Sequence, residues 1–443
     1  MNDAPIRALF PSLASHTAFL DNAGGSQIPG VVIEAITRYF HTSYAQLGGD
    51  YPQSKSAAQT IARGRAAIAS FLNAPAPSNV VLGASTSQLC LMLAHCFGDA
   101  LDAVRQNLPT AARSATLGLP ARRQVIVSTA GHESNVGPWM RLAHRGFEVI
   151  PWPTEKCEDG QYRPRLETLK KLLSDRTLIV TVPQVSNILG EVWNVRAMAD
   201  AAHAVGAKIL VDGVAYAPHA APDVQALDCD WYVYSTYKVF GPHMAAMFGK
   251  ADAWGTLTGQ NHFFIDPNEV PRKFETGGVC HEGCAGLAAL LDFARGACAA
   301  AGGPVPSTDR EALVSAFAAL RERELRLQHS ILTHLGSMPG IRLIGPGNGV
   351  GEHDRIGTVS FVSDWYEPKA LASAANHDGI AIRWGHFYSR RLVEELGLNP
   401  ERGVMRMSVL GYNTQAEVDR ALLFIETFTG ASEHGRSRGP GES

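Results

Sequence analysis

Short apolar runs alternate with helical patterns between residues 79 and 235. The runs are rich in β-branched residues and almost uniformly apolar, as expected for strands covered on both faces of a sheet. They occupy residues 79–83, 124–128, 147–151, 178–182, 207–211 and 231–235. Spacing near 3.6 residues predicts helices between them, over 86–96, 164–173 and 194–205. This alternation predicts an α/β fold with a mainly parallel sheet and helices on both of its faces.

The pattern changes after residue 308. A long amphipathic helix is predicted over 309–335, followed by strand-like pieces near 340–344, 355–363, 379–384 and 403–409. The run Thr414-Gln415-Ala416-Glu417 has the spacing of a capping box, which predicts the start of a closing helix. This mixture of strands and helices is typical of a smaller α+β domain.

We therefore expect a large domain over residues 20–300 and a small α+β domain formed by 1–19 together with 301–430. Residues 431–443 are rich in glycine, serine and charge, which predicts a disordered tail. The stretch 101–123 is polar enough to predict a surface loop.

Composition excludes several classes of protein. The 443 residues are 45% hydrophobic and 18% charged with a net charge of −3, so neither nucleic acid nor a membrane surface is an expected partner. No run approaches the roughly 20 apolar residues of a membrane span, and no signal peptide is expected. Seven cysteines in this length indicate reduced thiols in a cytoplasmic protein. The cysteines at 280 and 284 fit no strong zinc pattern, so we expect no metal site.

Polar side chains follow the carboxyl ends of the predicted strands, where open α/β sheets bind their ligands. The buried run 207–211 stops on a carboxylate, Asp212, and the next run is followed by a lysine, Lys238. Each of these residues alone is a weak signal, but together they predict one site. The candidates at successive strand ends are Ser85, Thr86, His132, Asn187, Asp212, Ser235, Tyr237 and Lys238.

This set of side chains suits pyridoxal 5'-phosphate. A lysine amine can hold the cofactor's aldehyde covalently, and a buried aspartate can pair with its protonated ring nitrogen. Hydroxyls and backbone N–H groups at the start of a helix, here Ser85 and Thr86, can bind the phosphate. An imidazole such as that of His132 can stack on the ring.

Several segments in order resemble the class V aminotransferases, specifically their cysteine desulfurase and selenocysteine lyase branch. They are FLDNAGGSQIP, GHESNVGPW, VSNILG, DVQALDCDWYVYSTYKVFGP, FETGG and MRMSVLGYNT, spread over residues 17–430. The resemblance implies the fold-type I architecture of pyridoxal-phosphate enzymes and a homodimer with its active sites at the subunit interface.

The resemblance also implies residue roles. Lys238 would hold the cofactor, Asp212 would pair with the ring nitrogen and His132 would stack on the ring. Thr86 and Ser235 would bind the phosphate, and Asn187 would lie beside the ring oxygen. Arg406 matches the arginine that holds the substrate carboxylate, and Arg383 matches a second family arginine.

The chain also departs from the desulfurase pattern. Tyr388 stands about where the loop cysteine of desulfurases attacks sulfur, and no cysteine follows Cys298. Tyr237 replaces the usual histidine before the lysine, Ala215 replaces a glutamine, and Gly278 replaces a threonine that reaches the partner's phosphate. The chain is most similar to a desulfurase-like subgroup without the loop cysteine.

We therefore predict a pyridoxal-phosphate enzyme that cleaves a C–S bond of cysteine or a cysteine-derived amino acid by β-elimination. The alternatives are a true desulfurase that uses another cysteine, an epimerase, an aminotransferase and, more remotely, a non-catalytic interaction module. Cys280, next to His281, is the other cysteine to test, against the alternative that it is an inert residue at the interface. The natural substrate and its leaving group are not identified by the sequence.

Overall fold

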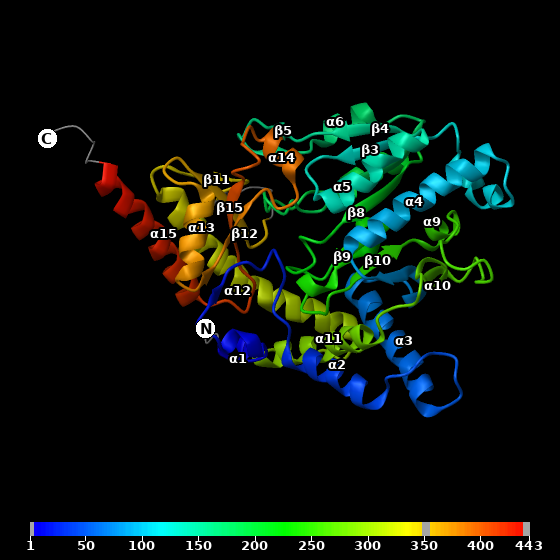
Figure 1. Cartoon of the computed structure of the whole chain (residues 1–443), viewed down its shortest axis with the longest axis horizontal. Helices are drawn as coiled ribbons and strands as arrows, with labels where there is room; N and C mark the ends of the chain where they lie inside the picture. Colours follow the sequence, from blue (N-terminus) through cyan, green and yellow to red (C-terminus); the bar gives the residue numbers. More distant parts are fainter. Residues whose placement is uncertain (1–3, 348–354, 437–443) are drawn as a thin grey trace.

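A seven-stranded sheet forms the centre of the molecule in the computed structural model, which describes residues 4–347 and 355–436 (Figure 1). The strand order is β2-β10-β9-β8-β7-β3-β4, and all neighbours are parallel except that β10 pairs antiparallel with β2 and β9. The strands are β2 Val80–Gly83, β3 Gln124–Ser128, β4 Glu148–Trp152, β7 Thr177–Pro183, β8 Lys208–Asp212, β9 Trp231–Ser235 and β10 Ala245–Gly249.

The six predicted strands are confirmed to within one residue at each end. The sequence analysis missed β10, whose residues Ala-Ala-Met-Phe-Gly carry no β-branched side chain. The mainly parallel sheet is confirmed, with this one antiparallel strand inserted between β2 and β9.

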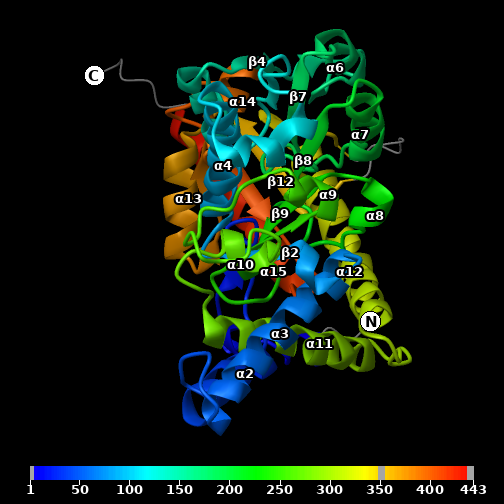
Figure 2. The same ribbon diagram turned by 90° about the vertical axis from the view of Figure 1, so that its right-hand side faces the viewer.

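Helices cover both faces of the sheet, because successive side chains of a strand point to opposite faces. Leu210 packs with α4 (Thr86–Arg105) and α5 (Glu133–Met140), whereas Ile209 and Val211 pack with the helices of the other face. Those helices include α3 Pro52–Leu72, α6 Leu166–Leu172, α7 Val195–Ala204 and α11 His281–Ala300. In Figure 2, α2 (Gly30–Thr42), α3 and α11 pack together below the sheet.

The stretch 101–123 lies largely at the surface, as expected, but the expectation of a loop is wrong for most of it. The helix α4 continues to Arg105, and a 3₁₀ helix, η3, follows over Pro109–Leu117. Leu101 of α4 and Leu117 of η3 are both buried in the core on this face of the sheet, so apolar anchors within a polar stretch hold it against the sheet.

A second, antiparallel sheet has the order β11-β12-β15-β14 and lies on the left in Figure 1. A separate apolar core joins it to the helices α12, α13 and α15. The capping box is confirmed, because Glu417 N–H donates to Thr414 Oγ1 (3.2 Å) and Thr414 N–H donates to Glu417 Oε2 (2.9 Å). These elements are β11 Ile341–Ile344, β12 Thr358–Ser363, β14 Arg383–Gly385, β15 Val404–Ser408, α12 Asp309–Ser337, α13 Pro368–His377 and α15 Gln415–Arg436.

The N-terminal segment adds to this second sheet region. Its strand β1 (Ala18–Phe19) pairs in parallel with β13 (Ile380–Ala381). The domain boundaries at residues 20 and 300 stay predictions. The disordered tail predicted over 431–443 is wrong for residues 431–436, which continue the helix α15, and residues 437–443 lie outside the described part of the chain. The remaining elements are α1 Ala4–Arg7, α8 Val224–Leu227, α9 Ala251–Gly255, α10 Val270–Phe274, α14 Arg390–Glu395, β5 Glu155–Lys156, β6 Tyr162–Arg163, η1 Pro11–Ala14, η2 Pro77–Asn79, η4 Arg141–Arg145 and η5 Thr236–Lys238.

Among the described residues, α11 is the one helix long and apolar enough to cross a membrane. It packs against α2, α3 and α12, and Leu287, Phe293 and Ala297 on it are buried. Its apolar sequence is therefore that of a core helix.

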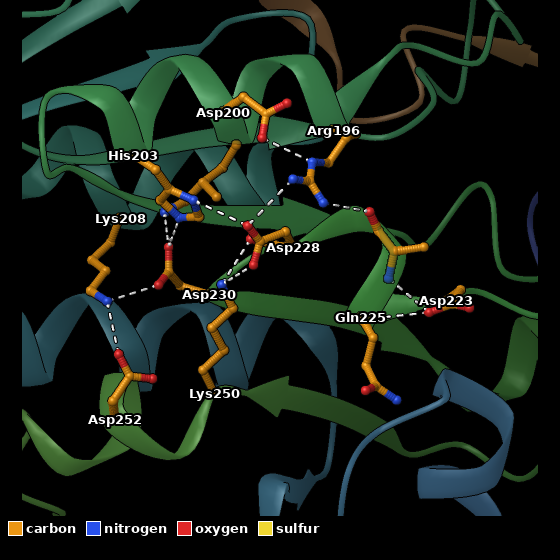
Figure 3. A network of polar contacts seen from close by, with 12 residues as sticks. Arg196, Asp200, His203, Lys208, Asp223, Gln225, Asp228, Asp230, Lys250 and Asp252 are labelled. Carbon is orange, nitrogen blue, oxygen red and sulfur yellow. Dashed lines mark hydrogen bonds and ion pairs between the residues drawn. The ribbon is translucent and has the colours of Figure 1, made fainter.

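Charged side chains connect the strands at the edge of the sheet that lies opposite their carboxyl ends (Figure 3). Asp230, just before β9, lies 2.9 Å from His203 Nε2 and accepts a hydrogen bond from Lys208 Nζ at 2.9 Å. Lys250, just after β10, pairs with Asp228. Burial raises the pKa of Asp230, but the His203 hydrogen bond and the Lys208 charge outweigh it and hold that pKa below its usual value. The network thus fixes β8, β9 and β10 and leaves the carboxyl edge to carry the site.

Candidate active site

A cavity of about 450 Å³ opens at the carboxyl ends of β8 and β9. It is bounded by the starts of α4 and α5 and by the loop that follows β14. Eight of the eleven predicted site residues line it: Ser85, Thr86, His132, Asp212, Ser235, Tyr237, Lys238 and Tyr388. The remaining three, Asn187, Arg383 and Arg406, lie outside this lining.

Asp212 and Lys238 bring opposite charges into the cavity. Asp212 is 4% exposed, and burial raises its pKa to about 6 although Val214 N–H donates to Oδ1 at 3.0 Å. Burial, followed by the charge of Arg406, lowers the pKa of Lys238 to about 8. A carboxylate that lacks a close cation and an amine that loses its proton readily are what the predicted chemistry requires.

A glycine must follow Asp212 because the β9 side chain Tyr232 occupies the space beside it. A Cβ on Gly213 would lie 2.0 Å from the Tyr232 hydroxyl oxygen. That hydroxyl donates to Gln184 Oε1 at 2.7 Å, which holds the ring in place. The chain after β8 therefore turns at Asp212 with its carboxyl group directed into the site.

Hydroxyl groups gather at the start of α4. Thr86 Oγ1 and Ser235 Oγ are 2.7 Å apart, and Ser85 caps the helix by accepting from Gln88 N–H at 3.1 Å. Ser87 and Ser134, whose Oγ atoms are 2.6 Å apart, also line the cavity but were not predicted. Ser87 directly follows Thr86 and Ser134 lies two residues after His132, so proximity to predicted residues in the turns after β2 and β3 is the signal that could have found them. A helix start with several hydroxyls favours a phosphate group.

His132 is a neutral ring in this site. Burial, then the charges of Lys238 and Arg406, lower its pKa to about 4. Its Nδ1 accepts from Ser134 N–H at 3.1 Å, so the proton of the neutral ring lies on Nε2. The ring centroid is 5.2 Å from that of Tyr388, whose carbonyl accepts from Glu133 N–H at 2.8 Å. The loop that carries Tyr388 is thereby joined to the start of α5.

Arg406 is almost fully buried beside the cavity, in β15. Its Nη1 donates to the Asn187 carbonyl at 3.3 Å, and its guanidinium carbon lies 3.7 Å from the centroid of the Phe387 ring. Burial lowers its pKa to about 10, which leaves the group charged at neutral pH. Its Nε has no hydrogen-bond partner among the described residues, so this N–H is left to donate to an anionic ligand.

Asn187 holds the loop after β14. Its Nδ2 donates to the Phe387 carbonyl at 2.9 Å, and its Oδ1 accepts from Ser389 Oγ at 2.7 Å. The predicted contact of Asn187 with a cofactor stays a prediction. Tyr237, in contrast, lines the cavity with its ring stacked on His243 at a centroid distance of 4.8 Å.

Asp21 was not assigned a role in the sequence analysis, although it lies in the quoted FLDN segment. Its carboxylate is 3.4 Å from Arg406 Nη2 and 3.6 Å from Arg383 Nη1. Arg383 is about half exposed and lies opposite Arg406 in the β14–β15 pair. In the sequence, Asp21 is marked only by its position after a strand-like segment. Its partners Arg383 and Arg406 lie far away along the chain.

None of the seven cysteines lines the cavity. Cys280 is exposed, and burial on one side followed by the effect of Glu282 raises its pKa. His281 Nδ1 lies 3.2 Å from the Tyr39 hydroxyl, which is therefore its polar partner. The shift is opposite to the one that a reactive thiolate needs, which favours the inert alternative for Cys280. Within residues 4–347 and 355–436, no group of three His, Cys, Asp or Glu side chains could hold a metal ion.

Comparison with known proteins places this geometry in context. The family model described as Aminotransferase class-V matches residues 18–301 and 313–421. Aminotransferase-like protein FGM3 of Gibberella zeae is 34% identical over 432 residues, which cover 95% of this chain and 97% of that protein. A cysteine desulfurase of Pectobacterium carotovorum is 30% identical over 440 residues, which cover 95% and 96% of the two chains.

Two solved structures share the fold. The cysteine desulfurase CsdA of Escherichia coli matches with a TM-score of 0.76 at 24% identity, over 96% of this chain and 98% of that one. The apo cysteine desulfurase of Thermococcus onnurineus matches with a TM-score of 0.78 at 22% identity, over the same shares. The α/β architecture is therefore that of fold-type I, as the sequence predicted.

Proposed function

The chain belongs to the aminotransferase class-V family, where it is related to the cysteine desulfurases, and we propose that it is a C–S lyase. It would bind pyridoxal 5'-phosphate and release a thiol from cysteine or a cysteine-derived amino acid by β-elimination. The observation that carries this proposal is a cavity that contains Lys238, Asp212 and His132 but no cysteine. A desulfurase needs a thiol to take sulfur, whereas an elimination does not.

The residues present fit the cofactor. The buried Asp212 carboxyl, with its raised pKa, would gain a partner from a protonated ring nitrogen. The hydroxyls of Thr86 and Ser235, with those of Ser85 and the Ser87–Ser134 pair, would hold the phosphate at the start of α4. The neutral ring of His132 would stack on the cofactor.

When bound, the cofactor withdraws electrons from the α-carbon of the substrate and so makes the α-proton acidic. Arg406 would bind the substrate carboxylate through its guanidinium, which Phe387 orients. Lys238, whose pKa of about 8 lies near neutrality, would remove the α-proton. The electron pair left on the α-carbon would form the Cα–Cβ double bond as the C–S bond breaks, and the sulfur would leave as a thiolate that takes up a proton. Hydrolysis of the released 2-aminoacrylate by water would give pyruvate and ammonium.

We further propose a cytoplasmic homodimer, as in the family. The subunit interface would include a groove lined by Leu47, Phe264, Gly277 and Gly278. Exposed aromatic and aliphatic side chains around this groove support the proposal that a second subunit covers it. Phe263 is 99% exposed and Phe264 is 68% exposed, which is unusual for side chains of this size.

The test compares products and absorbance. Purified protein with cofactor should have a visible absorbance band, and cysteine, its conjugates or its sulfoxides should yield pyruvate with the released thiol or sulfenate. Lys238→Ala should lose the covalent band and essentially all turnover, whereas Lys55→Ala, at an exposed lysine, should keep both. Alanine in place of pyruvate, or a persulfide on the protein during cysteine turnover, would contradict the lyase.

A further inference from the structure

Asp21 shares its carboxylate between two arginines. Its distances to Arg406 Nη2 (3.4 Å) and Arg383 Nη1 (3.6 Å) both exceed the roughly 2.7–2.9 Å of a tight charge-assisted hydrogen bond. The carboxylate therefore lies between two cations without a close bond to either. Of the three side chains, Arg406 is 3% exposed, Asp21 16% and Arg383 52%.

The backbone fixes this arrangement. Asp21 forms an isolated β-bridge with Ser408, which lies two residues beyond Arg406 on β15. Ser408 N–H donates to the Leu20 carbonyl at 2.7 Å. Arg383 and Arg406 are direct partners in the β14–β15 register. Two like charges opposite one another destabilise a strand pair, so Asp21 supplies the anion that this pair requires.

The space around Asp21 is closed as well. A Cβ on Gly24 would lie 3.0 Å from Asp21 Oδ2 and 3.2 Å from Arg383 Nη1. Any larger residue at position 24 would press on the ion group. Glycine at position 24 thus leaves room for the carboxylate to lie between the two arginines.

The charges leave room for one further anion. Two guanidiniums and one carboxylate carry a net charge of +1, which a single substrate carboxylate would neutralise. A second carboxylate that reached Arg383 would meet the negative charge of Asp21 beside it. We infer that Asp21, by pairing with Arg383, makes the site selective for amino acids with one carboxylate. This inference rests on the proposed role of Arg406 as the carboxylate site.

Removal of the Asp21 charge should create a second anion subsite. Both arginines contact the two oxygens of one carboxylate group, so they lie close enough for a short dicarboxylic acid to span them. The site would then bind a substrate of the aspartate type, with the α-carboxylate on Arg406 and the second carboxylate on Arg383.

Equilibrium binding to the cofactor-loaded protein tests this. The affinities of L-alanine and L-aspartate are measured from the change in the cofactor band, and those of propionate and succinate from the shift in unfolding temperature. The wild type should prefer the monocarboxylic acid at least tenfold in each pair. Asp21→Asn should reduce this preference at least tenfold through a gain in dicarboxylate affinity. The control Asp364→Asn makes the same charge change at an exposed residue that has no side-chain hydrogen bond or ion pair with described residues, and should keep the preference.

Further variants separate the outcomes. In Asp21→Asn/Arg383→Gln the gain should disappear, because it depends on Arg383. Arg383→Gln alone, which needs no change at Asp21, should keep the wild-type preference; a drop in its aspartate affinity would mean that Arg383 already binds a second carboxylate and would overturn the inference. Equal wild-type affinities for the monocarboxylic and the dicarboxylic acid would also overturn the inference. An equal loss of affinity for both acids in Asp21→Asn would do the same. If the wild type bound none of the four acids, the Arg406 site and the proposed function would fail instead.

Discussion

At the scale of single residues, the ionisation of Asp212 should control the stability of the cofactor-free protein. Its pKa is about 6 in the folded chain against 3.8 for an unperturbed aspartate. Ionisation of this buried group therefore opposes folding: the cost is absent below pH 3.8, grows as the pH rises and is complete above pH 6. The difference corresponds to about 3 kcal/mol.

Asp212→Asn should accordingly stabilise the cofactor-free protein at pH 8 by up to about 3 kcal/mol and have no such effect at pH 4. Denaturant unfolding at both pH values measures it. With saturating cofactor the wild type should be more stable than Asp212→Asn, because the protonated ring nitrogen pairs with the Asp212 carboxylate and not with an amide. If the difference in free energy of unfolding between Asp212→Asn and the wild type were the same at pH 4 and pH 8, the raised pKa of Asp212 would be refuted.

Single residues also mark the limit of prediction from sequence. Asp212 and Lys238 could be predicted because one ends an apolar run and the other closely follows the next run, and parallel strands bring their carboxyl ends to one edge. Asp21 could not, since its role depends on contacts with Arg383 and Arg406, more than 360 residues away along the chain. Local pattern carries no information about such pairings.

At the scale of elements, the loop after β14 is held in an unfavourable backbone conformation. Phe387 and Tyr388 have φ values of 48° and 59°, in the left-handed region that costs a non-glycine residue roughly 1–2 kcal/mol. The two side-chain hydrogen bonds of Asn187 to Phe387 and Ser389 oppose this strain. The sequence located the loop, but its conformation depends on this contact with a residue about 200 positions earlier.

Asn187→Ala should release this loop. Loss of two hydrogen bonds should lower the free energy of unfolding by about 1–3 kcal/mol and speed hydrogen exchange at residues 386–389. Exchange elsewhere in the sheet should change less. The matched control Asn261→Ala also removes two side-chain hydrogen bonds, because Asn261 Nδ2 donates to the Arg272 carbonyl at 2.7 Å and the Glu275 carbonyl at 3.1 Å. Unchanged exchange at residues 386–389 in Asn187→Ala would show that the loop is held by other contacts.

At the scale of the whole molecule, the alternation of apolar runs and helices was enough to predict the main sheet. The antiparallel β10 was not predictable, because Ala245–Gly249 has no β-branched residue and its burial comes from its neighbours β2 and β9. Assembly is a further step, since one chain's sequence does not say which exposed residues become covered. The exposed Phe263 and Phe264 are the strongest indication that the chain itself offers.

Phe263→Asp/Phe264→Asp should therefore convert the proposed dimer to a monomer. A buried interface would have to accommodate two carboxylates in place of two aromatic rings, which costs both the apolar burial and the desolvation of the charges. Light scattering across a dilution series measures the mass, and circular dichroism checks that the fold is kept. Turnover should fall with the dimer, because the resemblance implies active sites at the subunit interface of the proposed homodimer. Leu423→Asp changes an exposed leucine of α15 and should remain dimeric. A dimeric double variant with full activity would place the interface elsewhere.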